Sequence, residues 1–297
     1  MTVVRVDQLT DRLAIDDDGI WRTTVASEVS YPASGHSACL AVEESSFWFN
    51  HRNDCIRALV ASLPPAPGRP MLDVGGGNGY VSLGLARDGI DVILVEPGES
   101  GAANAKRRGV EHVICATTQT AGIRAGSVGA IGLFDVIEHI EDDHAFMSEM
   151  CALLTPGDRV YATVPAYQGL WSADDEKAGH YRRYSLDEIT ALIEQAGFEV
   201  DYASYFFRPL PAPVLFVRTV PHRLRALRGR SRSSDSHDTA GAEASVPDAV
   251  TTARSHAANT SAISRVIRRL LRSEVDNVAA HTTMRFGGSI VIAAHRR

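Results

Sequence analysis

The chain has 297 residues, enough for one large domain or two small ones, and its 44% hydrophobic content is ordinary for a globular protein. Its formal net charge of -6 argues against general nucleic-acid binding, and no nucleic-acid partner is expected. Four widely spaced cysteines without a CxxC pair, and an N-terminus without an apolar signal core, favour free thiols and a cytoplasmic location.

The first predicted element is a helix over residues 43–63, because residues 1–30 are polar and only weakly patterned. Large apolar side chains recur within it on one broad helix face. These residues are Phe47, Ile56, Leu59, Val60 and Leu63. A proline-rich segment at residues 63–68 ends this helix and forms a hinge into the next element.

From residue 71 onward, short apolar strands alternate with helices. Strands are expected at residues 71–74, 91–95, 112–116, 128–134, 159–164, 198–206 and 284–294. Helices are expected at residues 79–88, 101–108, 142–154 and 185–196. Repeated β–α units predict a doubly wound α/β fold, in which a parallel sheet carries helices on both faces. Gly287-Gly288 in the last strand predicts a β-bulge.

The composition changes between residues 226 and 261, where small and polar residues dominate and aromatic residues are absent. So few large apolar residues predict a disordered insert, followed by a helix at residues 263–275. Arginines lie before or at the start of the insert at positions 218, 223, 225, 228, 230 and 232, and after it at positions 265, 268, 269 and 272. This pattern allows peripheral contact with an anionic membrane surface, and the alternative is the solvated face of a helix packed on the core.

A glycine-rich turn follows the strand at residues 71–74. Glycines at every second position, Gly75, Gly77 and Gly79, let the backbone approach a ligand closely, and a helix N-terminus follows. The dinucleotide fingerprint GxGxxG would require a glycine at Tyr80, so the spacing fits a dinucleotide poorly. Asp73, two residues before the first glycine, suits a cationic ammonium or sulfonium ligand better than a pyrophosphate.

An acidic residue ends the next predicted strand. Glu96 lies roughly 20 residues after Gly75, the spacing at which a carboxylate accepts ribose hydroxyls. Different classes of nucleotide-like cofactor contain a ribose, so Glu96 indicates a ribose without identifying the cofactor.

Residues 40–207 and the last strand resemble the class I S-adenosylmethionine-dependent methyltransferases. The segment from Asp73 to Gly79 is similar to the family's first motif, and Glu96 to its ribose-binding acid. Residues 134–140, FDVIEHI, and 154–158, LTPGD, are similar to the segments after its fourth strand and before its fifth. The resemblance implies a Rossmann-like seven-strand sheet with an antiparallel last strand, and S-adenosylmethionine as methyl donor.

The resemblance also implies further cofactor contacts. The family often places an acidic residue after its third strand, where it contacts adenine. This chain has Cys115-Ala116-Thr117-Thr118-Gln119 at that position, so Thr117 or Gln119 would take the role. Asp135, after the fourth strand of the family fold, would line the cofactor or acceptor site.

Two histidines are candidate catalytic residues. His139 follows a strand whose carboxyl end lies on the ligand-binding edge of an open α/β sheet. Acidic neighbours should raise its pKa; the alternative is a surface histidine in an acidic helix start. His180 lies in a long loop at residues 164–184, and loops of this length tend to be functional.

The same loop carries candidate acceptor-binding residues, Tyr167, Trp171, Arg182 and Arg183. Its run TVPA…LWS…D…GHxRRY resembles a bacterial small-molecule subgroup of the family. The alternative is structural, with either arginine pairing with Asp174 or Asp175 to hold the loop.

The helix at residues 43–63 resembles that subgroup's lead-in helix, which often covers the pocket. Trp48, His51 and Arg52 are therefore candidates for acceptor or cofactor contacts, and the alternative is ordinary packing on the sheet.

These patterns predict residues 1–63 as a helical lid, 64–225 as the cofactor-binding core, 226–261 as the insert and 262–297 as a helix and closing strand. The predicted activity is methyl transfer to a small-molecule acceptor, with oxygen or nitrogen favoured over carbon and a lipid-linked acceptor as a variant. The alternatives are an NAD-dependent oxidoreductase and a non-catalytic S-adenosylmethionine-binding protein. No metal-ligand spacing stands out, so no metal is expected. The oligomeric state is not indicated.

Overall fold

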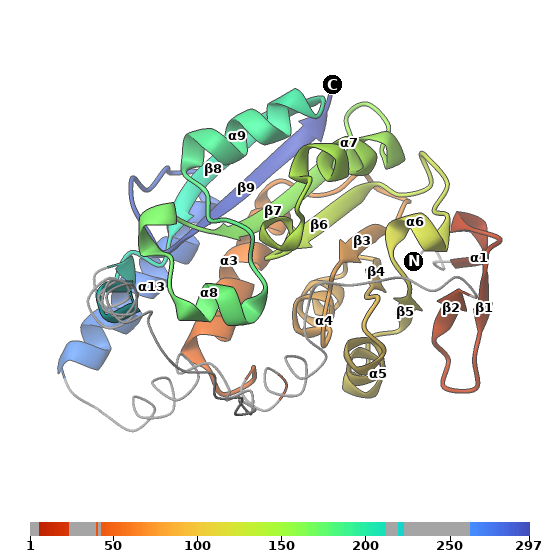
Figure 1. The fold of residues 1–297 in the computed structure, drawn as a ribbon, viewed down its shortest axis with the longest axis horizontal. Coiled ribbons are helices and arrows are strands. Elements are labelled where there is room, and N and C mark those ends of the chain that lie inside the picture. Colours follow the sequence, from red (N-terminus) through yellow and green to blue (C-terminus); the bar gives the residue numbers. More distant parts are fainter. Residues whose placement is uncertain (1–5, 24–39, 41–42, 212–218, 223–261) are drawn as a thin grey trace, which may run out of the picture.

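In the computed structural model, which describes residues 6–23, 40, 43–211, 219–222 and 262–297, nine strands form one sheet (Figure 1). The strands are β1 (Leu13–Ile15), β2 (Trp21–Thr23), β3 (Met71–Val74), β4 (Val92–Val95), β5 (His112–Cys115), β6 (Ala130–Phe134), β7 (Arg159–Pro165), β8 (Phe198–Phe206) and β9 (Ser289–Arg296). Their order is β1-β2-β5-β4-β3-β6-β7-β9-β8. Neighbours from β2 to β7 pair in parallel. The predicted α/β class is confirmed.

The antiparallel last strand is also confirmed. β9 pairs antiparallel with both β7 and β8, so it lies between two strands that point the same way. Consequently the carboxyl ends of β3, β4, β5, β6, β7 and β8 all lie on one edge of the sheet.

The sheet has two strands more than the seven predicted. The hairpin β1–β2 lies within residues 1–30, where no element was expected, and β2 pairs in parallel with β5. Each of these strands has only three residues, too few for an alternating pattern to be visible. Their position depends on pairing with the edge of β5, which is a tertiary contact.

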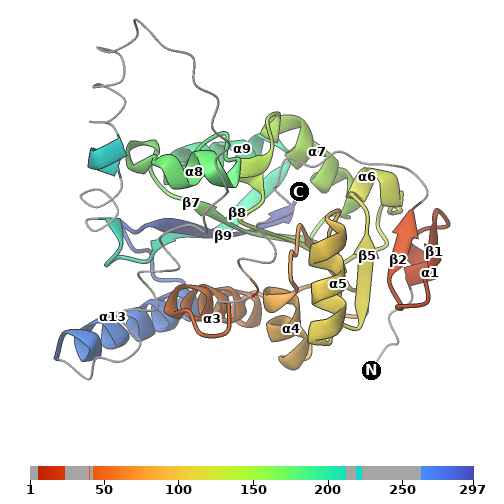
Figure 2. The ribbon, with the colours of Figure 1, turned by 60° about the horizontal axis from the view of Figure 1, so that its bottom comes forward.

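Helices cover both faces of the sheet. They are α1 (Val6–Leu9), α3 (Phe47–Ser62), α4 (Tyr80–Arg87), α5 (Glu99–Arg108), α6 (Thr118–Ala121), α7 (Asp143–Leu153), α8 (Ala173–Ala178), α9 (Leu186–Gln195) and α13 (Ala262–Ala279), with 3-10 turns η1 (Ile137–His139) and η2 (Gln168–Leu170). Figure 2 shows α3, α4 and α13 on one face and α7 and α9 on the other.

Alternation along each strand sends side chains to the two faces. In β3, Leu72 and Val74 pack in the core that contains the buried side chains of α7 and α9. Met71 packs instead in the core that contains residues of α3, α4 and α13. Both faces of the central strands are therefore buried, as expected for a doubly wound sheet.

The predicted bulge at Gly287-Gly288 is wrong. The register shift lies in β8, between Val200 and Tyr202, and both glycines precede β9. Gly287 is required for close backbone approach, because a Cβ there would lie 2.0 Å from the Phe206 carbonyl oxygen. Glycine at position 287 therefore reflects a real backbone constraint, which is close approach to the Phe206 backbone and not a β-bulge.

The predicted insert at 226–261 lies outside the described residues, as do the flanking arginines at 218, 223, 225, 228, 230 and 232. Arg269 and Arg272 are exposed on α13, whereas Leu271, Glu274 and Val278 of the same helix are buried. Glu274 accepts backbone N–H groups of Phe207 and Arg208 at 2.8 and 2.9 Å, which fastens α13 to the end of β8. Within the described residues, no helix is long and apolar enough to span a bilayer.

Candidate active site

Backbone strain concentrates where the strands end. Asp135, just after β6, has φ +58°, Tyr167, just after β7, has φ +58°, and Phe207, just after β8, has φ +60°. Side-chain-bearing residues rarely adopt positive φ, and such residues cluster at functional sites. All three lie on the carboxyl edge of the sheet, which marks this edge as the candidate site.

The glycine turn between β3 and α4 lies on the same edge. Gly75, Gly77 and Gly79 have φ of +68°, +53° and +76°. A Cβ on Gly75 would lie 2.8 Å from a Val136 methyl group, and one on Gly79 would lie 2.7 Å from Val110. Both conformation and space therefore require glycine here, and the turn can approach a ligand with its backbone alone.

Two buried carboxyl groups flank this turn. Asp73 is 1% exposed, and one of its oxygens accepts the Ser82 hydroxyl, while Oδ1 has no hydrogen-bond partner among the described residues. Burial raises the pKa of Asp73 to about 6, against the lowering effect of the Ser82 hydrogen bond.

Glu96 follows β4, beside β3. It accepts the N–H of Gly77 at 2.9 Å and that of Gly98 at 2.7 Å. Burial raises the pKa of Glu96 to about 7, and the negative charge of Asp73 adds to this effect. The glycine turn, the unpartnered Asp73 oxygen and Glu96 fit S-adenosylmethionine. Glu96 offers a carboxylate to the ribose, and the glycine turn leaves room for the methionine chain of the cofactor.

The predicted adenine contacts have other partners in this structure. Thr117 caps the start of α6 by accepting the N–H of Thr120 at 3.1 Å. Gln119 is exposed, and its side chain donates a hydrogen bond to Glu149 on α7.

Asp135 is held by two neighbours. Its Oδ1 accepts the Thr163 hydroxyl at 2.9 Å, and Oδ2 lies 2.7 Å from Nε of Arg52. Arg52 also donates to the Phe134 carbonyl at 2.7 Å, so it ties α3 to the end of β6. Arg52 is therefore buried among protein groups of the site and supports Asp135.

The other predicted contacts of α3 also pack within the protein. Trp48 stacks on Phe207, with ring centroids 5.5 Å apart. His51 Nε2 lies 2.8 Å from Oε2 of Glu274, a fully buried carboxylate. These contacts hold α3 against the ends of β8 and α13, beside the strained Phe207.

A buried polar network connects Glu43, which precedes α3, to the glycine turn. The sequence did not reveal this network. Glu43 accepts Nδ2 of Asn78 at 3.0 Å and pairs with Nη1 of Arg108 at 2.5 Å. Arg108 also donates to the Asn78 carbonyl at 2.9 Å. Glu43, which precedes α3, is therefore fastened directly to the turn that would hold the cofactor.

The loop after β7 contains η2 and α8. His180 Nδ1 and Arg183 Nε lie 2.9 and 2.7 Å from the same Asp175 oxygen. Burial alone would raise the pKa of Asp175, but the hydrogen bonds from His180 and Arg183 outweigh it and lower the pKa to about 2. Arg183 thus makes the loop-holding ion pair that the structural alternative predicts.

Arg182 pairs differently. Its Nη1 lies 2.7 Å from Asp143 on α7, and Nη2 donates to the Glu141 carbonyl. Tyr167 stacks on Tyr205 with ring centroids 4.9 Å apart, and Trp171 is half-buried. The loop is thus held against α7 and the end of β8.

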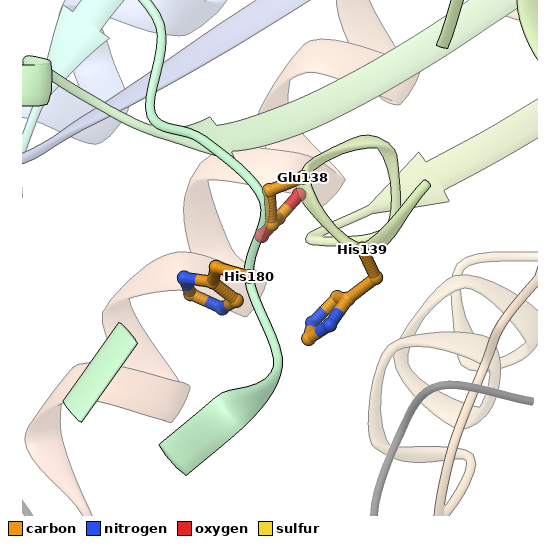
Figure 3. Close-up of side chains that lie close together, drawn as sticks. All are labelled: Glu138, His139 and His180. Carbon is orange, nitrogen blue, oxygen red and sulfur yellow. The ribbon is translucent and has the colours of Figure 1, made fainter. Parts of the chain in front are cut away.

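This arrangement brings His139 and His180 together, with Glu138 between them and the sheet (Figure 3). The two rings are 4.7 Å apart and nearly perpendicular. The expectation that acidic neighbours raise the pKa of His139 is wrong. Burial and the nearby His180 lower this pKa to about 4, and the charge of Asp135 and a hydrogen bond with the Gly179 backbone offset only part of the effect. His139 is consequently neutral near pH 7.

Sequence reasoning did not single out Glu138 or Asp175 as site residues. Glu138 is 1% exposed, and burial together with the Asp135 charge raises its pKa well above the ordinary value. Glu138 lies inside the segment 134–140, and the resemblance of this segment to a family motif could have pointed to Glu138 as a site residue. Asp175 could be read as an ion-pair partner but not as the group that orients His180.

The fold, the glycine cradle and Glu96 define a Rossmann-like S-adenosylmethionine-dependent methyltransferase class. A family model described as a methyltransferase domain matches residues 48–203, more than half of the chain, and the chain belongs to this family. S-adenosylmethionine is the cofactor of this class.

Curated relatives are also named as methyltransferases. A probable S-adenosylmethionine-dependent methyltransferase of Mycolicibacterium smegmatis is 28% identical over 176 residues, covering 57% of this chain and 66% of that protein. A ubiquinone biosynthesis O-methyltransferase of Rhizobium etli is 31% identical over 168 residues, covering 50% and 68%. The chain spans 66% of the Mycolicibacterium smegmatis relative, and 65% and 54% of two further relatives, so it covers less than two thirds of the length of each.

A solved structure supports the fold. Phosphoethanolamine N-methyltransferase 2 of Haemonchus contortus, in complex with phosphomonomethylethanolamine and S-adenosylhomocysteine, superposes with a TM-score of 0.54. The superposition covers 90% of this chain and 58% of that one, at 17% sequence identity.

Proposed function

We propose that this protein transfers a methyl group from S-adenosylmethionine to an oxygen or nitrogen of a small-molecule acceptor. The observation that carries the proposal is the shared edge of the sheet, where the glycine turn and Glu96 lie beside the ends of β6 and β7 with their histidine pair. The donor supplies an activated methyl group on a positively charged sulfur. The reaction then depends mainly on positioning the acceptor and excluding water.

On the donor side, we assign Asp73, Gly75, Gly77, Gly79 and Glu96 to cofactor binding, with Gln119 and Asp135 as further contacts. Glu96 would accept the ribose hydroxyls through its carboxylate oxygens. Asp73 would balance the positive charge of the donor through its unpartnered oxygen.

On the acceptor side, we assign His139 and His180 to contact with the reacting group. The acceptor oxygen or nitrogen forms a bond to the methyl carbon, and the carbon–sulfur bond breaks with its electron pair on sulfur. The acceptor's proton leaves to the surrounding groups or water. The side chains that contact the rest of the acceptor would be Trp48, Arg52, Tyr167, Trp171, Arg182 and Arg183. The bacterial small-molecule subgroup with a GHxRRY loop remains our proposed placement within the family.

The relatives' names favour small acceptors. The Rhizobium etli relative is named for ubiquinone biosynthesis and O-methylation, and the Haemonchus contortus structure contains a small phosphorylated amine. We propose the same size class for this chain, in a pathway of small-molecule metabolism in the cytoplasm.

The proposal is tested by incubating the protein with methyl-labelled S-adenosylmethionine and a panel of hydroxylated and amino-bearing small molecules. Label should enter at least one acceptor, and His139→Asn and His180→Asn should each lower turnover about 100-fold with S-adenosylmethionine affinity unchanged. His144→Asn is the matched control, because His144 is exposed on α7. Cofactor binding without transfer to any acceptor would instead favour the non-catalytic alternative.

A further inference from the structure

We propose that Glu138, His139 and His180 form a binding site for a divalent transition-metal ion, with Zn²⁺ as the reference ion. The inference rests on the proposed function only in its consequence for the acceptor; the site itself is argued from the cluster. Glu138 and His139 belong to η1, and His180 comes from the loop after β7, 41 residues further on.

The first argument is geometric. One ligand atom from each of the three residues, a carboxylate oxygen and two imidazole nitrogens, lies within 4.8 Å of the others. In Figure 3 the three side chains converge on one space at the end of the sheet. Ligands of a tetrahedral zinc lie about 2.1 Å from the ion and therefore roughly 3.4 Å from one another. Small side-chain rotations would bring this set to that spacing.

The second argument is the state of Glu138. This carboxyl group is 1% exposed, and its Oε2 has no hydrogen-bond partner among the described residues. A buried carboxylate without a partner is costly, and a bound cation would offset that cost.

The third argument is the support of His180. Its Nδ1 lies 2.9 Å from Asp175, a carboxylate that also binds Arg183 and the Ser172 backbone N–H. Nδ1 therefore carries the proton, which leaves Nε2 as the ligand atom. A carboxylate that orients a metal-binding histidine through its other nitrogen is a recurring feature of zinc sites.

The backbone holds the two halves of the cluster in register. Tyr181, next to His180, donates its N–H to the Glu138 carbonyl at 2.8 Å. Two histidines and one carboxylate leave a fourth position on a tetrahedral ion. At this edge of the sheet, that position would hold an oxygen or nitrogen of the acceptor, which narrows the acceptor to compounds with a metal-binding group.

The test uses the whole 297-residue chain, treated with a chelator, dialysed and titrated with Zn²⁺ by calorimetry. We expect one equivalent to bind with micromolar or tighter affinity. Co²⁺ should bind competitively and give a visible absorption spectrum of a four- or five-coordinate site. Glu138→Gln, His139→Asn and His180→Asn should each weaken binding at least tenfold, and Asp175→Asn about 10- to 100-fold. His144→Asn should bind as the unmodified protein does.

The inference is overturned if the unmodified protein binds neither ion in a saturable way, or if the cluster variants bind as tightly as His144→Asn does. The Co²⁺ spectrum of the unmodified protein keeps the test decisive where a variant fails to fold. Methyl transfer by the chelated protein at an undiminished rate would reject the role of the ion and leave the proposed function intact. Metal binding without any methyl transfer would reject the proposed function and leave the metal site intact.

Discussion

At the scale of single residues, two neighbouring carboxyl groups determine how the site responds to pH. Glu96 is buried beside Asp73, and the pKa of Glu96 is raised to about 7 and that of Asp73 to about 6. Both groups would bind a cationic ribose-containing ligand in their ionised form. Ligand binding should therefore favour the deprotonated form of both carboxyl groups.

The first prediction is that the affinity for S-adenosylmethionine rises with pH up to about 7. If only ionised Glu96 accepts the ribose hydroxyls, affinity falls about tenfold for each pH unit below the pKa. The stability of the ligand-free protein should move in the opposite direction. A folded-state pKa above the unfolded value means that Glu96 takes up protons on folding, so its contribution falls as pH rises from the unfolded pKa to about 7.

Calorimetric titration with S-adenosylmethionine between pH 6 and pH 8 measures the effect. Glu96→Gln should bind more weakly and should lose most of the pH dependence in this range, because the group that titrates is gone. A variant that keeps the full dependence would assign it to another group.

At the scale of elements, the segment before α3 is fastened to the glycine turn by one buried pair. Glu43 and Arg108 have side chains only 8% and 7% exposed, and both also bind Asn78. Glu44, the next residue, is 79% exposed and lies 4.0 Å from the same arginine. These adjacent glutamates form a natural matched pair.

We therefore predict that Glu43→Ala lowers the free energy of unfolding by roughly 3 kcal/mol, because it leaves Arg108 buried without its partner. Glu44→Ala should change it by less than about 0.5 kcal/mol, as is usual for an exposed pair. Urea unfolding measures both values. Glu43→Ala should also weaken S-adenosylmethionine binding, since Asn78 lies in the turn. Equal effects of the two substitutions would show that the segment does not support the turn.

At the scale of the whole molecule, the proposed cofactor site joins elements from most of the described chain. The turn lies between β3 and α4, Glu96 follows β4, and residues of α3 and α13 pack beside the ends of β6 and β8. A ligand that binds only the folded protein should therefore stabilise the molecule as a unit.

S-adenosylmethionine at 100 times its Kd should add about 2.7 kcal/mol to the free energy of unfolding and raise Tm by several degrees. NAD at the same concentration should leave Tm unchanged, because Tyr80 stands where the dinucleotide fingerprint has glycine. Thermal unfolding with each ligand decides between the two cofactors. Stabilisation by NAD alone would support the oxidoreductase alternative.

Features that depend on neighbouring residues could be predicted from the sequence. The strands β3 to β8, the helices α4, α5, α7 and α9 and the need for glycine at positions 75 and 79 follow from apolar patterning and backbone stereochemistry. Glu96 could be placed because the turn and the next strand are close in the chain. The family resemblance added the donor, and the match over residues 48–203 agrees with it.

Features that depend on residues far apart in the chain were decided by the tertiary structure. The hairpin β1–β2 joins the sheet only because the edge of β5 is available to it. Arg182 pairs with Asp143 on α7, which no local pattern indicates. The sequence by itself determined the fold class and predicted a donor site, because both depend on patterns among residues that are close together in the chain. Only the tertiary structure placed Glu138 and His139 against His180, and only burial in that fold made His139 neutral, because burial and distant contacts are properties of the packed chain.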